Sequence, residues 1–278
     1  MNTMAVLITS YNRRDKTLQC LKNIAEQKDL PGMELSIFLV DDNSSDGTTE
    51  AVRFQFPHVN LIKGTGQLFW AGGMRAAWRS ALTDKKKFIY YLLVNDDTFL
   101  YSNALKNLMA DKNAVGENSI IVGSVKDPVT GNFSYGGRIL KNNYSIAASK
   151  VIPDNNSPQL CDFGNGNLML IPSLVVDKIG ILSDCYTHGL ADIEYTTKAK
   201  KAGIPSYISS YYLGECTNDF DPELKRKNKF SLKQRVEYLY SVKGFCYKEY
   251  LYFIRNYFPL YLPQAWLSLW VKTIMPPL

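Results

Sequence analysis

The sequence predicts an α/β protein in which a mostly parallel, Rossmann-like sheet is flanked by helices, with a helical appendage at the C-terminal end. Short apolar strands alternate with amphipathic helices, several strands end in polar groups, and residues 221–278 differ in composition from the rest. The chain has 278 residues, of which 46% are hydrophobic and 21% are charged, as in a folded globular protein. This length allows one main domain with an appendage.

The first part of the chain alternates strand and helix. The run at 5–10 is apolar and ends in Thr and Ser, and the helix after it carries Leu18, Leu21 and Ile24 at helical spacing. Strands that alternate with helices at this interval favour parallel pairing. The expected order is strand 5–10, helix 13–27, strand 35–42, helix 46–56, strand 59–64, helix 71–84 and strand 88–97.

From Phe99 onward the pattern is less regular. A hairpin is expected in 127–140, where glycines mark the turns, and a helix is expected to end at Gly203. The other predicted elements are strands at 119–125 and 205–209 and helices at 172–180 and 192–203.

Charge and cysteine content limit the classes of protein. Residues 221–278 contain ten Lys or Arg against four Asp or Glu, which leaves 22 against 22 in residues 1–220 and places the whole net charge of +6 in this last segment. The first residues lack the basic and long apolar regions of a signal peptide, so we expect a cytoplasmic protein. Five scattered cysteines without a CxxC pair predict reduced, mostly buried thiols.

Acidic side chains follow two of the predicted strands. In parallel α/β sheets the ligand crevice lies outside the carboxyl ends of the strands, and here those ends carry "TSYN", "DDNSSDG" and "NDD". An ordinary strand-to-helix turn explains residues 46–48 but not the acids Asp41 and Asp42 on the strand itself. Because an aspartate can bond a nucleobase imide or ribose hydroxyls, nucleotide recognition is the alternative.

The pair Asp96 and Asp97 ends the apolar run "YYLLV". Two adjacent carboxylates repel each other and lose hydration on burial unless a cation or donor meets them. Mg²⁺ or Mn²⁺ suits hard oxygen ligands and would allow these acids to lie beside a diphosphate.

Four motifs resemble glycosyltransferase family 2, whose members have the GT-A fold and include inverting sugar transferases. They are "VLITSYNRRD", "FLVDDNSSDGT", "LLVNDD" and "GLADIEYTTKAKKAG", and the resemblance covers roughly residues 4–215. It implies a catalytic domain at 1–220, divided into a nucleotide-binding half at 1–97 and an acceptor half at 98–220. The segment 221–278 lies outside it.

The resemblance implies roles for individual residues around the donor. Asp96 would meet the ribose and Asp97 would bind the metal. The nucleobase of the donor would be held by three residues, with two more nearby. In the segment "GQLFWAGGMRAAW", two glycines would permit close backbone approach to the diphosphate and an arginine could face phosphate. The base-side residues are Thr9, Tyr11 and Asp42, with Arg13 and Asp41 nearby, and the segment contributes Gly72, Gly73 and Arg75.

Trp70 in the same segment would shape the sugar pocket, and a core aromatic at a helix entry is the alternative interpretation. The general base implied by the resemblance is Asp192, with Ala191 where Glu is common in the family. The alternative for Asp192 is a cap of the following helix. The acceptor pocket would be lined by Gly164, Asn165 and Gly166, for which a plain turn is the competing explanation.

The expected metal shell departs from the family pattern. Many members have a His after the last core strand, but here the chain reads Glu215, Cys216 and Thr217. His188, four residues before Asp192, is a further candidate ligand, with a structural or solvated His as the alternative.

The basic aromatic segment 221–278 lacks a nucleic-acid motif, so we expect no nucleic-acid partner. Its longest uncharged run, 256–271, contains Pro259 and Pro263 and is shorter than the roughly 20 apolar residues of a spanning helix. Docking on an anionic membrane surface is one expectation, suited to a lipid-linked acceptor. Packing on the core, or on a second subunit in a homodimer, is the other.

The predicted function is therefore a metal-assisted glycosyltransferase that uses a nucleoside-diphosphate sugar, acts on a glycan or lipid-linked acceptor and serves cell-surface polysaccharide assembly, peripheral to the cytoplasmic face of the membrane. The segment "LFWAGGM" resembles some rhamnosyl-transferring members, which suggests dTDP-rhamnose as donor. A sugar-phosphate nucleotidyltransferase is an alternative, although "TSYNRRD" lacks the Gly-rich loop of that class. The non-enzymatic alternative is an inactive nucleotide-binding or membrane scaffold.

Overall fold

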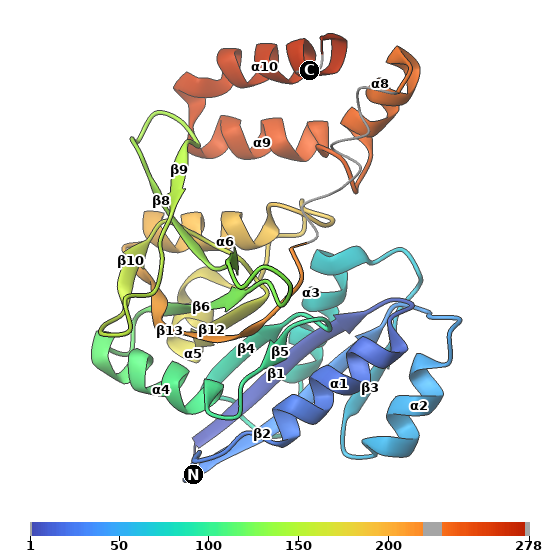
Figure 1. The fold of residues 1–278 in the computed structure, drawn as a ribbon, viewed down its shortest axis with the longest axis vertical. Coiled ribbons are helices and arrows are strands. Elements are labelled where there is room, and N and C mark those ends of the chain that lie inside the picture. The colour runs from blue at the N-terminus through green and yellow to red at the C-terminus, as the bar shows by residue number, and fades with distance from the viewer. Residues whose placement is uncertain (1, 219–229, 276–278) are drawn as a thin grey trace.

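A computed structural model of the chain describes residues 2–218 and 230–275 (Figure 1). A ten-stranded sheet runs through the main body in the order β10-β13-β6-β12-β4-β1-β2-β3, with β5 paired to β13 and β7 to β6. The strands are β1 (Asn2–Ser10), β2 (Met33–Asp41), β3 (Asn60–Lys63), β4 (Tyr90–Val94), β5 (Phe99–Leu100), β6 (Ile120–Lys126), β7 (Phe133–Tyr135), β10 (Gln159–Cys161), β12 (Leu168–Pro172) and β13 (Ser206–Glu215). A small second sheet contains β8 (Gly137–Leu140), β9 (Ala148–Lys150) and β11 (Phe163–Gly164).

The N-terminal half confirms the expected α/β alternation. Strand β1 pairs in parallel with both β2 and β4, and β2 pairs in parallel with β3. The intervening helices return the chain to the amino end of the next strand, which is why each strand ends at the same edge. These helices are α1 (Arg14–Ala25), α2 (Thr48–Gln55) and α3 (Phe69–Leu82).

The following part of the sheet contains a strand that the sequence pattern did not predict. Strand β12 runs antiparallel to both β4 and β6, and so joins residues 1–97 and 98–218 into one sheet. Its five residues are all buried, and a short apolar run next to a predicted helix gives no periodicity by which to assign it. The helices here are α4 (Ala104–Val115), α5 (Ser173–Ile179) and α6 (Ala191–Lys201).

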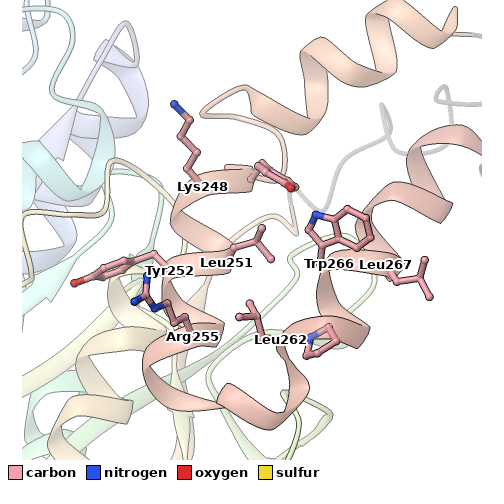
Figure 2. Close-up of a pocket in the computed structure, with 9 residues that line it drawn as sticks. Lys248, Leu251, Tyr252, Arg255, Leu262, Trp266 and Leu267 are labelled. Atoms are coloured by element: carbon pink, nitrogen blue, oxygen red, sulfur yellow. The ribbon is translucent and has the colours of Figure 1, made fainter.

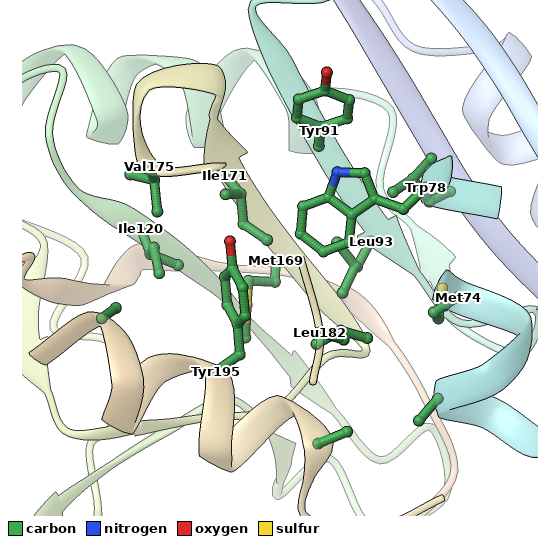
Figure 3. Close-up of a cluster of buried hydrophobic side chains, with 14 of the residues drawn as sticks. Met74, Trp78, Tyr91, Leu93, Ile120, Met169, Ile171, Val175, Leu182 and Tyr195 are labelled. Atoms are coloured by element: carbon green, nitrogen blue, oxygen red, sulfur yellow. The ribbon is translucent and has the colours of Figure 1, made fainter. Parts of the chain in front are cut away.

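The core has a layer on each face of the sheet. Along β1, Ala5 and Leu7 face the layer that contains α3 and α6, whereas Val6 and Ile8 face the layer beneath α1 and α4. Figure 3 shows the first layer, in which Trp78 stacks at a ring-centroid distance of 5.6 Å from both Tyr91 and Tyr195. With no exposed surface, Trp78 is a core residue.

Three further helices form the C-terminal part: α8 (Leu232–Tyr240), α9 (Tyr247–Tyr257) and α10 (Leu262–Ile274). Helix α9 buries Phe253 and Ile254 in the α6 layer, where Phe253 contacts Phe163. Helix α10 lies beyond α9 in Figure 1. The predicted boundary at 220/221 lies outside the described residues. Within the described ranges, no helix combines the length and the apolar content that crossing a bilayer requires.

Candidate active site

The parallel register brings the predicted donor residues to one edge of the sheet. Ser10 at the end of β1 pairs with Asp41 at the end of β2, and Leu7 pairs with Leu93 of β4. The polar residues that follow these strands therefore begin at the same level. Among them Tyr11 is 53% exposed, which leaves its ring accessible at the edge.

Asp41 and Asp42 hold the loops that surround this edge. The Asp41 carboxylate accepts a hydrogen bond from the Ser44 amide (2.9 Å) and another from the Thr49 hydroxyl. Asp42 accepts from the amides of Gly66 (2.7 Å) and Leu68 (2.9 Å) and from that of Phe69 (3.2 Å). Because the first amides of a helix have no partner within the helix, a carboxylate at this position stabilises the start of α3. Contact of Asp41 or Asp42 with a base remains a prediction.

Arg13 lies against the paired acids. Its Nη1 is 3.2 Å from Asp96 Oδ1 and 2.6 Å from Asp97 Oδ2. Burial raises the pKa of Asp96 to about 6; Arg13 opposes this rise and the neighbouring Asp97 adds to it. Asp96 Oδ2 is buried and has no hydrogen-bond partner among residues 2–218 and 230–275. The site therefore holds more negative charge than Arg13 alone satisfies.

Cys216 lies directly beside Asp97. Its Sγ is 3.6 Å from Asp97 Oδ1 and accepts a hydrogen bond from Asn167 Nδ2 at 3.4 Å. Burial raises the pKa of this thiol to about 12, and Asp97 contributes to the rise. His188 packs with its ring 6.4 Å from that of Phe69. Burial lowers its pKa, while the nearby Asp192 carboxylate opposes this effect and Arg13 adds to it. Among the described residues, no three His, Cys, Asp or Glu side chains converge as a metal shell, and a ligand role of His188 remains a prediction.

Asp192 lies in the first turn of α6. Leu190, and not Asp192, is the N-cap residue of this helix, and no side chain of the described residues caps it. Asp192 nevertheless bonds a first-turn amide, so part of the helix-start alternative stands. Its Oδ2 accepts from the Gly166 amide and its Oδ1 from the Ile193 amide, both at 2.8 Å. Burial raises the pKa of Asp192, and these amides oppose the rise. A carboxylate of raised pKa is a stronger base than an ordinary aspartate.

Trp70 lies between the paired acids Asp96 and Asp97 on one side and the carboxylate of Asp192 on the other. Its Nε1 donates to Asn95 Oδ1 at 2.7 Å, next to Asp96. The far edge of its ring packs on Gly166, where an added Cβ would lie 2.5 Å from Trp70 Cη2 and 3.3 Å from Asp192 Cβ. Trp70 is therefore part of the site wall. The role of Asn95 was missed, although its place before the two aspartates was a signal.

Three of the predicted donor-side residues have packing or hydrogen-bond contacts within the protein, and a base contact of Thr9 remains a prediction. The Arg75 guanidinium donates to the carbonyls of Ser183 (2.9 Å) and Tyr186 (2.8 Å), so it braces a loop and does not face a phosphate. An added Cβ on Gly73 would lie 2.0 Å from Thr9 Oγ1, because α3 packs directly on β1 there. Gly73 and Thr9 therefore pack against each other.

The predicted acceptor residues differ in environment. Gly164 is buried, its amide donates to Thr196 Oγ1 at 3.1 Å, and an added Cβ would lie 2.5 Å from Val122. Tight packing therefore explains this glycine, and acceptor contact does not. Asn165 accepts a hydrogen bond from the Gly136 amide at 3.4 Å. The acceptor roles of Asn165 and Gly166, and the donor role of Gly72, remain predictions.

The C-terminal helix α9 holds the loop that leads to Asp192, which sequence reasoning missed. Glu249 accepts from the amide (3.0 Å) and from the hydroxyl (2.6 Å) of Thr187. The Thr187 carbonyl accepts from the amide of Ala71, the residue after Trp70. Tyr257 on α9 donates to Glu194 of α6 at 2.6 Å. Helix α9 is thus part of the support of the candidate active site.

A mostly parallel sheet flanked by helices, with paired acids at the edge where its strands end, is the arrangement of the GT-A fold. The profile of glycosyl transferase family 2 matches residues 5–164, more than half of the chain. The chain belongs to this family, which disfavours the nucleotidyltransferase alternative. No curated protein matches the sequence.

Solved structures show the same fold. A mannosyltransferase from Pyrobaculum calidifontis, in complex with GDP-Man and Mn²⁺, has 17% identity and a TM-score of 0.59, over 99% of this chain and 76% of that one. S. aureus TarS 1-349 in complex with UDP has 16% identity and a TM-score of 0.55, over 93% of this chain and 72% of that one. At these identities the likeness concerns the fold alone.

Proposed function

We propose that this chain transfers a sugar from a nucleoside-diphosphate donor to an acceptor hydroxyl with inversion at the anomeric carbon. The observation that carries this proposal is the position of Asp192, whose carboxylate bonds the Gly166 amide while Trp70 links Gly166 to Asn95 beside the paired acids. A base and a donor-binding edge on opposite sides of one aromatic ring suit a direct displacement.

In the proposed reaction Asp192 accepts the proton of the acceptor hydroxyl. The hydroxyl oxygen bonds the anomeric carbon as the bond from that carbon to the diphosphate oxygen breaks, and the nucleoside diphosphate leaves with the electron pair. The raised pKa of Asp192 favours this proton transfer. The amides of Gly166 and Ile193 hold the carboxylate in one orientation throughout.

The donor edge fits a divalent cation that arrives with the donor. Asp96 has a buried carboxylate oxygen for which the described part of the chain offers no hydrogen-bond partner, and Asp97 lies beside it. Mg²⁺ and Mn²⁺ are commonly held by one or two carboxylates together with substrate phosphates, so the lack of a complete protein shell among the described residues fits this mode. Asp97, with Asp96, would hold the ion, which when bound neutralises charge on the departing diphosphate.

The segment "LFWAGGM" bears on the identity of the donor sugar. We propose dTDP-rhamnose or another deoxyhexose donor because of the "LFWAGGM" segment, whose Trp70 lines the site. The mannosyltransferase complex contains GDP-Man and the TarS complex contains UDP, and these ligands support a nucleotide-sugar donor. A lipid-linked or glycan acceptor would place the chain in cell-surface polysaccharide assembly.

A thermal-shift screen of UDP-, dTDP- and GDP-sugars with and without Mn²⁺ tests the donor site. Ligand at about 100 times its Kd stabilises a protein by about 2.7 kcal/mol, so we expect one donor to raise Tm by about 5 °C in the presence of Mn²⁺. Asp97→Asn should remove the part of this rise in Tm that depends on Mn²⁺. The matched control is Asp15→Asn, at an exposed acid on α1. Equal shifts in Asp97→Asn and wild type would exclude Asp97 as the ligand, and binding without hydrolysis or transfer would favour a scaffold.

We further propose that the C-terminal helices dock on the cytoplasmic membrane surface. One face of α10 exposes Trp266, Leu267, Val271 and Ile274, each by 48–56%. Helix α10 has 13 residues and a single charge, Lys272, and at about 1.5 Å per residue it is too short to span a bilayer. An apolar face of this kind, near exposed lysines, suits the interface of an anionic leaflet.

Replacement of Val271 and Ile274 by Glu should reduce binding to phosphatidylglycerol vesicles at least tenfold in a co-sedimentation assay, because it puts charge on the exposed apolar face. Circular dichroism and Tm should change little, since both side chains are about half exposed. Val129→Glu, at an exposed apolar residue far from these helices, is the control. Undiminished vesicle binding would contradict docking through α10, and a dimer lost in the double variant would assign this face to a second subunit.

A further inference from the structure

A groove of about 770 Å³ lies between α9 and α10 (Figure 2). Its volume falls within the range of about 300–1,000 Å³ that is typical of small-molecule sites. The residues that line it are Tyr247, Lys248, Leu251, Tyr252, Arg255, Leu262, Pro263, Trp266 and Leu267.

The lining combines an apolar floor with a positive rim. Leu251 on α9 and Leu262 and Trp266 on α10 are aliphatic or aromatic and line the space between the helices. Lys248 and Arg255 are seven residues apart on α9, so they lie on one face with two helical turns between them. Both are exposed, and none of the described residues that line the groove is acidic.

The groove adjoins the residues that hold the loop before Asp192. Tyr252 in its lining contacts Tyr186, with ring centroids 6.3 Å apart. Glu249, one residue after Lys248, bonds Thr187 in the loop that leads to Asp192. A ligand held along α9 would therefore lie next to the loop that leads to the proposed base.

We propose that this groove binds the acceptor itself through its lipid anchor: a lipid phosphate whose apolar chain lies between α9 and α10 and whose phosphate pairs with Lys248 and Arg255. Charge selects this occupant. A second copy of the chain in a twofold interface would bring the same positive rim against itself, whereas a phosphate complements it. A neutral glycan would leave the apolar floor unused. This inference rests on the proposed function and names the acceptor class of that site.

Binding of farnesyl phosphate, a short isoprenyl phosphate, to the full chain without vesicles tests the proposal by isothermal titration calorimetry. We expect binding at least tenfold tighter than that of farnesol, and no measurable binding of inorganic phosphate. Lys248→Glu with Arg255→Glu should weaken binding at least tenfold, and so should Trp266→Ser, at a half-exposed position that folding tolerates. Lys243→Glu and Val129→Ser, at exposed residues outside the groove, are the matched controls.

Three outcomes would overturn the proposal: no binding of farnesyl phosphate, equal binding by the groove variants, or a dimer in light scattering that Trp266→Ser converts to monomer. Binding to phosphatidylglycerol vesicles alone, unchanged in the groove variants, would also overturn it and leave only surface docking. The donor screen with Mn²⁺ is independent of the groove, so a failed proposed function would appear there. If farnesyl phosphate does not bind but the donor does, only the proposed acceptor class is refuted, and the proposed function stands.

Discussion

Asp192→Asn should lower the rate of sugar transfer by about 10²–10⁴-fold, the range that a positioned general base contributes. The amide has nearly the same shape and can still accept a hydrogen bond from Gly166 or Ile193, but it cannot take the acceptor proton. Donor binding should be unchanged, because the paired acids lie on the other side of Trp70. The measurements are single-turnover transfer and the donor-dependent rise in Tm.

Asp177→Asn is the matched control, since Asp177 is an exposed aspartate within helix α5. It should leave transfer at the wild-type rate. Turnover preserved in Asp192→Asn would remove Asp192 from the catalytic role. Loss of donor stabilisation together with transfer would indicate instead that Asp192 supports the fold of the site.

The pH dependence of transfer should also show that a buried aspartate is the base. Asp192 works as a base only when ionised, and burial raises its pKa. Transfer should therefore fall as the pH is lowered through this raised value, so the acid limb of kcat/KM lies above about 3.9, the pKa of an ordinary aspartate. A limb at or below that value would argue against a buried aspartate as the base.

Gly166→Ala should reduce transfer by about 100-fold, because a misplacement of about 1 Å near reacting groups can have this effect. The added Cβ would lie 2.5 Å from Trp70 Cη2 and Cζ2, so the indole must move away from its bond with Asn95. Gly189→Ala is the control: it lies in the loop before Asp192, with nothing within 4 Å of an added Cβ. It should retain wild-type transfer.

The double variant Gly166→Ala with Trp70→Phe separates steric from backbone causes. Phe lacks both the outer edge of the indole that meets the added Cβ and the Nε1 donor to Asn95, so Trp70→Phe alone should already lose this bond. Adding Gly166→Ala to it should cause little further loss of transfer, and the two changes should be non-additive. Additive losses would mean that Gly166 is needed for its own backbone conformation. Trp70 would then be only a neighbour of the site.

The strand ends of the N-terminal half were predictable from the sequence for a simple reason. Parallel strands joined by helices must end at one edge, so the acids after β2 and β4 had to lie near the end of β1. The apolar runs and polar stops that show this are local in sequence. The family motifs at 6–15, 38–48 and 92–97 likewise identified the family, which the profile match over residues 5–164 confirms, while the fourth motif at 189–203 lies outside that match.

Contacts between distant segments were not predictable in this way. Strand β12 occupies the middle of the sheet through antiparallel pairing with β4 and β6, which depends on long-range partners. Arg75 was expected to face phosphate, but only the fold shows that the loop at Ser183 and Tyr186 lies within reach of its guanidinium. Glu249 carried no local signal at all, because its partner Thr187 is 62 residues away.

By itself the sequence determined the α/β alternation, the acids at the strand ends and the composition of a basic, aromatic C-terminal segment, because each is written in residues that are neighbours along the chain. The tertiary structure alone decided that Arg13 meets Asp96 and Asp97, that Trp70 packs on Gly166, and that α9 supports the loop before Asp192. These contacts depend on which buried surfaces pack together, and such packing is a property of the whole fold.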